Sequence, residues 1–155
     1  MSEELELRRA APADAEAVRA LTRQAYAKWV PLIGREPKPM QADYERAVRE
    51  RRIDLAYRDG ALAGLIETIA LPDHLLIENV AVAPSWQGRG IGRALMAHAE
   101  RLAAALHHRE LRLYTNKAFA ENVALYLKLG YRIDHEEGTS AFGVVVHMSK
   151  ALAGA

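Results

Sequence analysis

Apolar residues recur at helical spacing in four segments of the 155-residue chain. The longest such pattern comprises Ile91, Leu95, Ala99, Leu102 and Leu106. Their intervals of three or four residues place all of them on one face of a helix. The same spacing predicts helices over residues 12–27, 41–52, 91–106 and 120–129.

Shorter apolar runs, some with alternating polar positions, predict strands. Asp59-Gly60 joins two of these runs, and this dipeptide is a strong signal for a β-hairpin. The predicted strands cover residues 4–9, 53–58, 61–71, 74–82, 111–115, 131–133 and 142–148. Because strands and helices mix along the chain without a linker or repeat, we expect one α/β (α+β) domain over residues 1–155.

The segment between the first two predicted helices contains Pro31, Gly34, Pro37 and Pro39. Proline lacks a backbone N–H and fixes its own φ angle, so it disfavours the interior of helices and central strands. The sequence therefore predicts a loop over residues 30–40.

Composition excludes several classes of function. The chain has no cysteine, which excludes disulfides, cysteine-ligated metals and a thiol nucleophile. Its six histidines show no ligand-like spacing, so we expect no metal. A net charge of +1 provides no field that would attract nucleic acid or an anionic membrane. The sequence shows no signal peptide and no apolar run of about 18 residues, so we expect a cytoplasmic protein.

A glycine-rich loop, Gln87-Gly88-Arg89-Gly90-Ile91-Gly92, separates a predicted strand from the clearest helix. Such a loop can hold a phosphate, because its N–H groups and the helix dipole both favour an anion. The dinucleotide fingerprint does not fit, since Arg93 stands where it requires a glycine, and the Walker tripeptide is absent. The alternative is a tight turn that only ends the strand.

Three motifs together resemble the GNAT superfamily of N-acetyltransferases. Residues 87–92 match its Q/R-x-x-G-x-G/A motif, residues 80–84 resemble its fourth strand, and residues 125–131 resemble its Leu-Tyr-x-x-x-Gly-Phe/Tyr signature. The order of elements also matches from end to end. The resemblance implies a mixed, mostly antiparallel sheet of about six to seven strands, splayed between the fourth and fifth strands, with about four helices. It implies acetyl-CoA as co-substrate in that gap.

The resemblance assigns the contacts to acetyl-CoA mainly to the backbone of the fourth strand and of the loop. These segments contribute Val80, Ala81, Val82, Gln87, Gly88, Arg89, Gly90, Ile91, Gly92 and Arg93. The side chains of Arg89 and Arg93 are equally well explained as solvated surface groups. Phe119 stands where the family usually has asparagine, so Asn116 and Asn122 are both candidates for the pantetheine amide, or else turn and cap residues.

Acetyl transfer to an amine requires a base, an oxyanion donor and an acid. The resemblance places Tyr126 beside the thioester sulfur as the acid, and core packing is the alternative. Glu78 is the candidate base, because a carboxylate within a buried strand requires an explanation. Counted by twos, it shares a face with Val80 and Val82, and the N–H of Val80 is the candidate oxyanion donor. Alternatively, Glu78 is structural, paired with an arginine or at a bulge marked by Asn79.

In the family, the segment between the first two helices covers the acceptor side of the cleft. The candidate acceptor-binding residues are Tyr26, Trp29, Arg35 and Met40. Arg35 and Lys38 outnumber Glu36 there, and arginine can hold a carboxylate with two hydrogen bonds. We therefore expect a small amine that carries an anionic or aromatic group, in preference to a polycation.

The sequence thus predicts an N-acetyltransferase that transfers the acetyl group of acetyl-CoA directly to a primary amine of a small molecule, or of a peptide or protein. A non-catalytic acyl-CoA-binding or sensor domain of the same fold is the main alternative, and a nucleotide-phosphate binder is a third. No nucleic-acid or membrane partner is expected, and a homodimer stays open.

Overall fold

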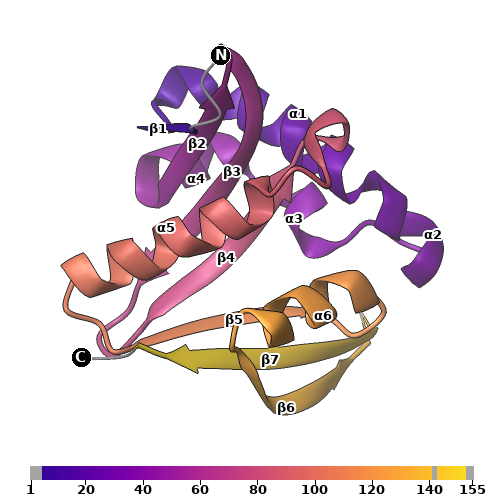
Figure 1. Ribbon diagram of the computed structural model, residues 1–155. Coiled ribbons are helices and arrows are strands. Elements are labelled where there is room, and N and C mark those ends of the chain that lie inside the picture. The colour runs from indigo at the N-terminus through magenta and orange to yellow at the C-terminus, as the bar shows by residue number, and fades with distance from the viewer. Residues whose placement is uncertain (1–4, 141–142, 153–155) are drawn as a thin grey trace.

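A computed structural model describes residues 5–140 and 143–152, which form one seven-stranded sheet with helices on both faces (Figure 1). The strand order is β1-β2-β3-β4-β5-β7-β6. The strands are β1 (Glu6–Arg9), β2 (Arg52–Arg58), β3 (Ala61–Ala70), β4 (Leu75–Val82), β5 (Glu110–Asn116), β6 (Arg132–Thr139) and β7 (Gly143–Ala151). The mixed α/β architecture and the seven strands confirm the predicted fold class.

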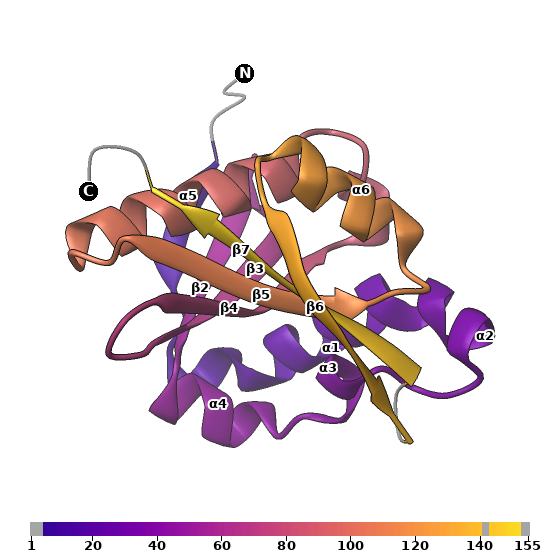
Figure 2. The ribbon, with the colours of Figure 1, turned by 90° about the horizontal axis from the view of Figure 1, so that it is seen from below.

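The helices cover the sheet in two groups. The four predicted helices are α1 (Ala15–Tyr26), α4 (Tyr44–Glu50), α5 (Ile91–Ala105) and α6 (Ala120–Lys128). Figure 2 shows α1 and α4 on one side of the sheet and α5 and α6 on the other. None of these helices, nor any other in the described part of the chain, is long and apolar enough to cross a membrane.

Two apolar cores hold these layers together. On one face, Val18 and Leu21 of α1 pack with Ile53, Leu55 and Leu65 of the sheet. On the other face, α5 packs against β3, β4, β5 and β7 through its apolar stripe. That stripe consists of Ile91, Leu95, Met96, Ala99 and Ala103, all buried. The periodicity of the sequence therefore identified Ile91, Leu95 and Ala99 correctly, whereas Leu102 is only partly buried and Leu106 is exposed.

The sheet opens between β4 and β5. These two strands are parallel and pair only from Leu75 to Ile77 on β4 and from Leu111 to Leu113 on β5. Beyond that point the strands diverge, and Glu78 and Tyr114 are the first residues past the last pair. The predicted splay between the fourth and fifth strands is confirmed, and these two residues mark the apex of the V-shaped gap.

A β-bulge interrupts β4 at the apex. Glu67 pairs with Asn79 and Thr68 pairs with Ile77, so Glu78 is the extra residue. The predicted bulge next to Asn79 is thus present, but the expected sharing of one face by Glu78, Val80 and Val82 is wrong. Ile77 and Val80 both face the α5 core, because the bulge reverses the alternation.

The segment predicted as a loop contains two single-turn helices, α2 (Val30–Ile33) and α3 (Lys38–Gln41). Pro31 and Pro39 lie in the first turns of these helices, where no intrahelical backbone donor is needed. The prediction of a loop without helix was therefore wrong, because the prolines begin these turns instead of breaking them. This segment, residues 30–40, lies next to the open end of the gap between β4 and β5 (Figure 1).

Candidate active site

A cleft of about 370 Å³ lies where β4 and β5 diverge. Its wall is formed by the end of α1, the last residues of β4, the glycine loop, the start of α5 and one face of α6. The residues predicted from the sequence that line it are Tyr26, Trp29, Val80, Ala81, Val82, Gln87, Gly88, Gly90, Ile91, Gly92, Arg93, Asn122 and Tyr126.

The glycine loop presents an open helix N-terminus to this cleft. Gly90 is the N-cap of the 15-residue helix α5, and no side chain caps the first turn. Its φ of +82° is a left-handed conformation that favours glycine, and an added Cβ would meet nothing within 4 Å. Unpaired N–H groups, the positive end of the helix dipole and Arg93 in the wall together suit a phosphate group.

Two of the predicted cofactor residues lie outside the cleft wall. The guanidinium of Arg89 lies over the ring of Trp86, 5.0 Å from its centroid. Asn116 accepts a hydrogen bond from the backbone N–H of Ala118 at 2.9 Å, as a turn residue does. Of the two candidate asparagines, only Asn122 lines the cleft.

The ring of Tyr126 lies in the cleft wall, with its centroid 6.0 Å from that of Tyr131. Burial raises the pKa of the Tyr126 hydroxyl to about 12, so the phenol keeps its proton at neutral pH. Tyr126 also packs against the α5 core, so the two roles considered for it, acid and core residue, are compatible in space.

Tyr26 connects the end of α1 to β4. Its hydroxyl donates to the side-chain oxygen of Asn79 at 2.8 Å and lies 3.1 Å from the carbonyl oxygen of Val80. Trp29 stacks on Phe119, with ring centroids 4.6 Å apart. Both aromatic residues line the cleft beside the glycine loop, although the sequence suggested the acceptor side.

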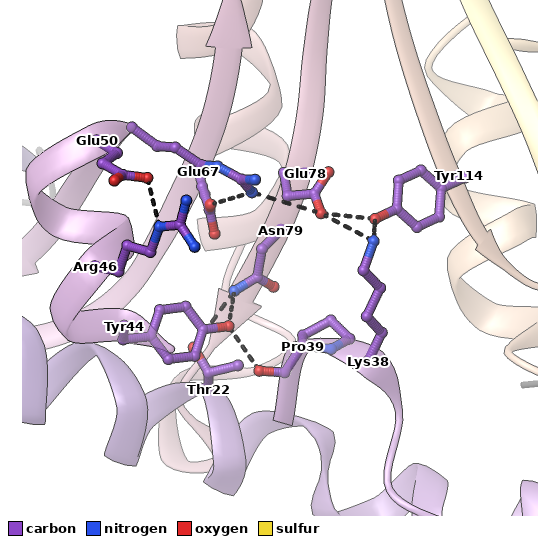
Figure 3. A network of polar contacts seen from close by, with 11 residues as sticks. Thr22, Lys38, Pro39, Tyr44, Arg46, Glu50, Glu67, Glu78, Asn79 and Tyr114 are labelled. Atoms are coloured by element: carbon purple, nitrogen blue, oxygen red, sulfur yellow. Dashed lines mark hydrogen bonds and ion pairs between the residues drawn. The ribbon is translucent and has the colours of Figure 1, made fainter. Parts of the chain in front are cut away.

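A polar network fills the other side of the gap (Figure 3). The hydroxyl of Tyr114 donates to Glu78 Oε1 at 2.7 Å, and Lys38 Nζ lies 3.6 Å from the same carboxylate oxygen. Lys38 Nζ also donates to the Tyr114 hydroxyl oxygen at 3.1 Å. Burial and the bond to Glu78 raise the pKa of Tyr114, so this phenol remains a donor. Three elements far apart in the sequence thus meet at Glu78.

A second carboxylate, which the sequence analysis missed, lies beside Glu78. Glu67 of β3 is only 3% exposed, and its Oε2 lies 3.3 Å from Nη1 of Arg51. That Arg51 nitrogen also lies 3.9 Å from Glu78 Oε1, so one arginine joins both carboxylates. Burial raises the pKa of Glu67, and Arg51 opposes that rise. A signal did exist, because Glu67 is the one charged residue between apolar positions 65 and 70 of a strand.

These carboxylates open into a pocket of about 290 Å³ between α3, α4, β3 and β4. Its charged side chains are Lys38, Asp43, Arg46, Glu50, Arg51, Glu67 and Glu78. Arg46 pairs with Glu50 at 2.8 Å, as Arg51 pairs with Glu67, so much of this charge is compensated within the pocket. The pocket therefore combines both signs of charge next to the candidate base.

Two of the predicted acceptor residues line neither the cleft nor this charged pocket. Nη1 of Arg35 donates to the carbonyl oxygen of Ser140 at 3.0 Å, and its side chain lines a separate hollow that Asn116 shares. The side chain of Met40 is buried, and its carbonyl oxygen accepts a hydrogen bond from Arg23 at 2.9 Å. The structure thus brings Tyr26 and Trp29 to the gap and leaves Arg35 and Met40 at a distance from it.

Known proteins share both sequence and fold with this chain. Streptothricin acetyltransferase from Streptomyces lavendulae is 36% identical over 75 residues, which cover 47% of this chain and 40% of that relative. A solved GNAT-family structure from Desulfovibrio desulfuricans superposes with a TM-score of 0.77 at 21% identity, covering 97% of this chain and 100% of the other.

The PaiA N-acetyltransferase of Thermoplasma acidophilum was solved in complex with coenzyme A. It matches with a TM-score of 0.74 at 19% identity, over 96% of this chain and 99% of its own. At 21% and 19% identity, the Desulfovibrio and Thermoplasma structures show that the fold is shared. The family model described as Acetyltransferase (GNAT) family matches residues 16–131, well over half of the sequence. The chain therefore belongs to the acetyltransferase (GNAT) family.

Proposed function

We propose that this protein transfers the acetyl group of acetyl-CoA to the primary amine of a small molecule. One observation carries the proposal: the gap between β4 and β5 has the open N-terminus of α5 on one side and the Glu78 carboxylate on the other. An anionic co-substrate and an ammonium group thus have complementary sites that meet at one apex. The coenzyme A complex of the Thermoplasma relative supports the same donor.

The apex and the cleft wall together supply candidates for the three groups that the chemistry requires. Glu78 accepts a proton from the incoming ammonium, which leaves a neutral amine as nucleophile. The N–H of Val80 donates to the carbonyl oxygen as it becomes an oxyanion. Tyr126 keeps its proton because burial raises its pKa to about 12, and it donates that proton to the departing sulfur. Tyr114 and Lys38 hold the carboxylate of Glu78 in place.

The main alternative is a domain that binds an acyl-CoA without catalysis. The position of Tyr126 in the cleft wall, together with Glu78 at the apex, favours the enzyme. A pure binding domain requires neither a protonated phenol nor a carboxylate at the point where the strands part.

The identity of the acceptor is open to direct test. One relative is named for streptothricin, so streptothricin is the first candidate. The expected preference for an anionic or aromatic amine over a polyamine stays a proposal, and the mixed charge of the pocket beside Glu78 is compatible with either type.

The decisive experiment measures thiol release with a chromogenic disulfide reagent while the protein, acetyl-CoA and one amine are mixed. The amines are streptothricin, amino acids, aryl amines and polyamines, each assayed separately. We expect at least one amine to raise thiol release well above the rate with acetyl-CoA alone. If acetyl-CoA raises the melting temperature but no amine accelerates release, the non-catalytic alternative gains support.

A further inference from the structure

The ammonium group of Lys38 lies in a site that suits a primary amine. Its Nζ is 3.6 Å from Glu78 Oε1 and 3.1 Å from the Tyr114 hydroxyl oxygen. It also lies 5.3 Å from the centroid of the Tyr114 ring. A carboxylate and an aromatic face both attract an ammonium ion, and a phenol oxygen can accept one of its hydrogen bonds. Figure 3 shows Lys38 and Tyr114 converging on Glu78.

This site stands at the apex of the gap. Glu78 and Tyr114 directly follow the last paired residues of β4 and β5. Lys38 and Tyr26 line a common hollow of about 80 Å³, and Tyr26 also lines the cleft that holds the glycine loop. The amine of Lys38 therefore lies beside the candidate base, and its side chain shares a hollow with a residue of the proposed acetyl-CoA cleft.

We propose that the protein acetylates its own Lys38, within the same chain. This inference rests on the proposed function, because it uses the same donor and the same base. Glu78 takes one proton from the Lys38 ammonium, and the freed electron pair forms a bond to the acetyl carbonyl carbon. The carbon–sulfur bond breaks, and Tyr126 protonates the departing thiolate. The nitrogen loses its second proton, which restores the phenol of Tyr126, and Glu78 passes the first proton to solvent. The products are Nε-acetyl-lysine, free CoA and one proton released to solvent.

The fold makes this reaction specific to one lysine. Lys38 belongs to the four-residue helix α3, and its side chain is 60% exposed, so it has room to move toward the cleft. Lys117 is a close match in other respects: it is 59% exposed and pairs with a carboxylate, Glu136, at 3.0 Å. Unassisted acetylation by acetyl-CoA should affect both lysines alike. Of these two lysines, Lys38 is the one that lies beside Glu78 at the apex.

The test is peptide mass spectrometry on the full chain incubated with acetyl-CoA and no amine. We expect Lys38 to be acetylated at least about tenfold faster than Lys117, because the base and amine are already in place. The first-order rate constant should not change when the protein is diluted tenfold. Equal rates at the two lysines, or a rate constant that falls with dilution, would overturn the proposal.

Two variants separate this inference from the proposed function. Gly90→Glu, which places a negative side chain in the glycine loop, should reduce Lys38 acetylation to the Lys117 level and leave Lys117 unchanged. Lys38→Arg should remove the modification, because a guanidinium group does not take up the acetyl group. If the native protein turns over a free amine but leaves Lys38 unmodified, self-acetylation is wrong and the transferase stands. If neither amine nor Lys38 is acetylated, both proposals fail.

Discussion

The two sides of the gap between β4 and β5 are built from different parts of the chain. On the side with the glycine loop, one continuous stretch from the end of β4 through residues 87–92 provides the backbone that faces the cleft, and α1 and α6 complete the wall. The opposite side consists of long charged side chains from four separate elements. They are Lys38 of α3, Arg51 after α4, Glu67 of β3 and Glu78 of β4.

This difference has a physical origin. A pyrophosphate can be held by backbone N–H groups, which every residue has, so the sequence must only supply glycines that allow the loop to form. An amine requires side-chain carboxylates and phenols at set positions, and these can come from any strand or loop that reaches the apex. We therefore expect changes in the loop to affect every acceptor alike, and changes on the charged side to depend on the acceptor.

The largest expected effect is on acetyl-CoA binding, through the glycine loop. Gly90→Glu should abolish binding of acetyl-CoA, because it adds a negative side chain where an anion binds and strains a residue with φ of +82°. Gly60→Glu is the matched control, since Gly60 has φ of +78° and open space around an added Cβ but lies in the β2–β3 hairpin. The measurement is the shift in melting temperature with acetyl-CoA.

Both glycine variants should lose similar stability without ligand, and only Gly90→Glu should lose the shift with acetyl-CoA. Loss of the shift in both would mean that backbone strain alone explains the result. An undiminished shift with Gly90→Glu would show that the loop does not bind the co-substrate.

The second-largest expected effect concerns the two carboxylates on the charged side of the gap, Glu78 and Glu67. Glu78→Gln should lower kcat by about 100-fold, because the amide cannot take a proton from the ammonium. Glu67→Gln should lower it much less, since Glu67 is joined to Glu78 through Arg51. The check is kcat of each variant at saturating acetyl-CoA and amine, with KM for the amine measured alongside. If Glu67→Gln shows the larger loss, Glu67 is the base.

Tyr126→Phe should lower kcat by about tenfold or more with little change in the affinity for acetyl-CoA. The substitution removes the proton donor and keeps the ring that packs against the α5 core. Tyr131→Phe is a suitable control, because the two rings are neighbours and both phenols are buried. An unchanged kcat for Tyr126→Phe, under conditions where chemistry limits the rate, would leave Tyr126 as a core residue only.

The glycine-loop side and the charged side of the gap also differ in how far the sequence predicted them. The loop and most of the buried face of α5 were predictable from local spacing, whereas the splay was predictable only from the resemblance to the GNAT superfamily. Glu78 was identifiable from a carboxylate in a buried strand, but its orientation was not, since one extra residue in β4 reverses the alternation. Lys38, Arg51 and Tyr114 carried no local signal. Their roles arise from tertiary contacts between residues up to 76 positions apart.

The smallest expected effect compares two arginine–glutamate pairs by stability. Burial raises the pKa of Glu67, whereas the hydrogen bond from Arg23 lowers the pKa of the half-exposed Glu36. A raised pKa means that the ionised Glu67 costs stability above its folded pKa, and that this cost vanishes below the ordinary value of 4.5. A lowered pKa means that Glu36 adds stability at neutral pH, which is lost as the pH falls through its folded pKa.

Urea unfolding of Glu67→Gln and Glu36→Gln between pH 4 and pH 7 checks these signs. Relative to the native protein, Glu67→Gln should be more stable at pH 7, and its advantage should shrink as the pH falls. Glu36→Gln should be less stable at pH 7, and its deficit should persist down to about pH 4.5 and begin to shrink only below it. If Glu67→Gln is instead destabilised at pH 7, the bond to Arg51 outweighs the cost of burial, and Glu67 is a structural anchor for that arginine beside Glu78.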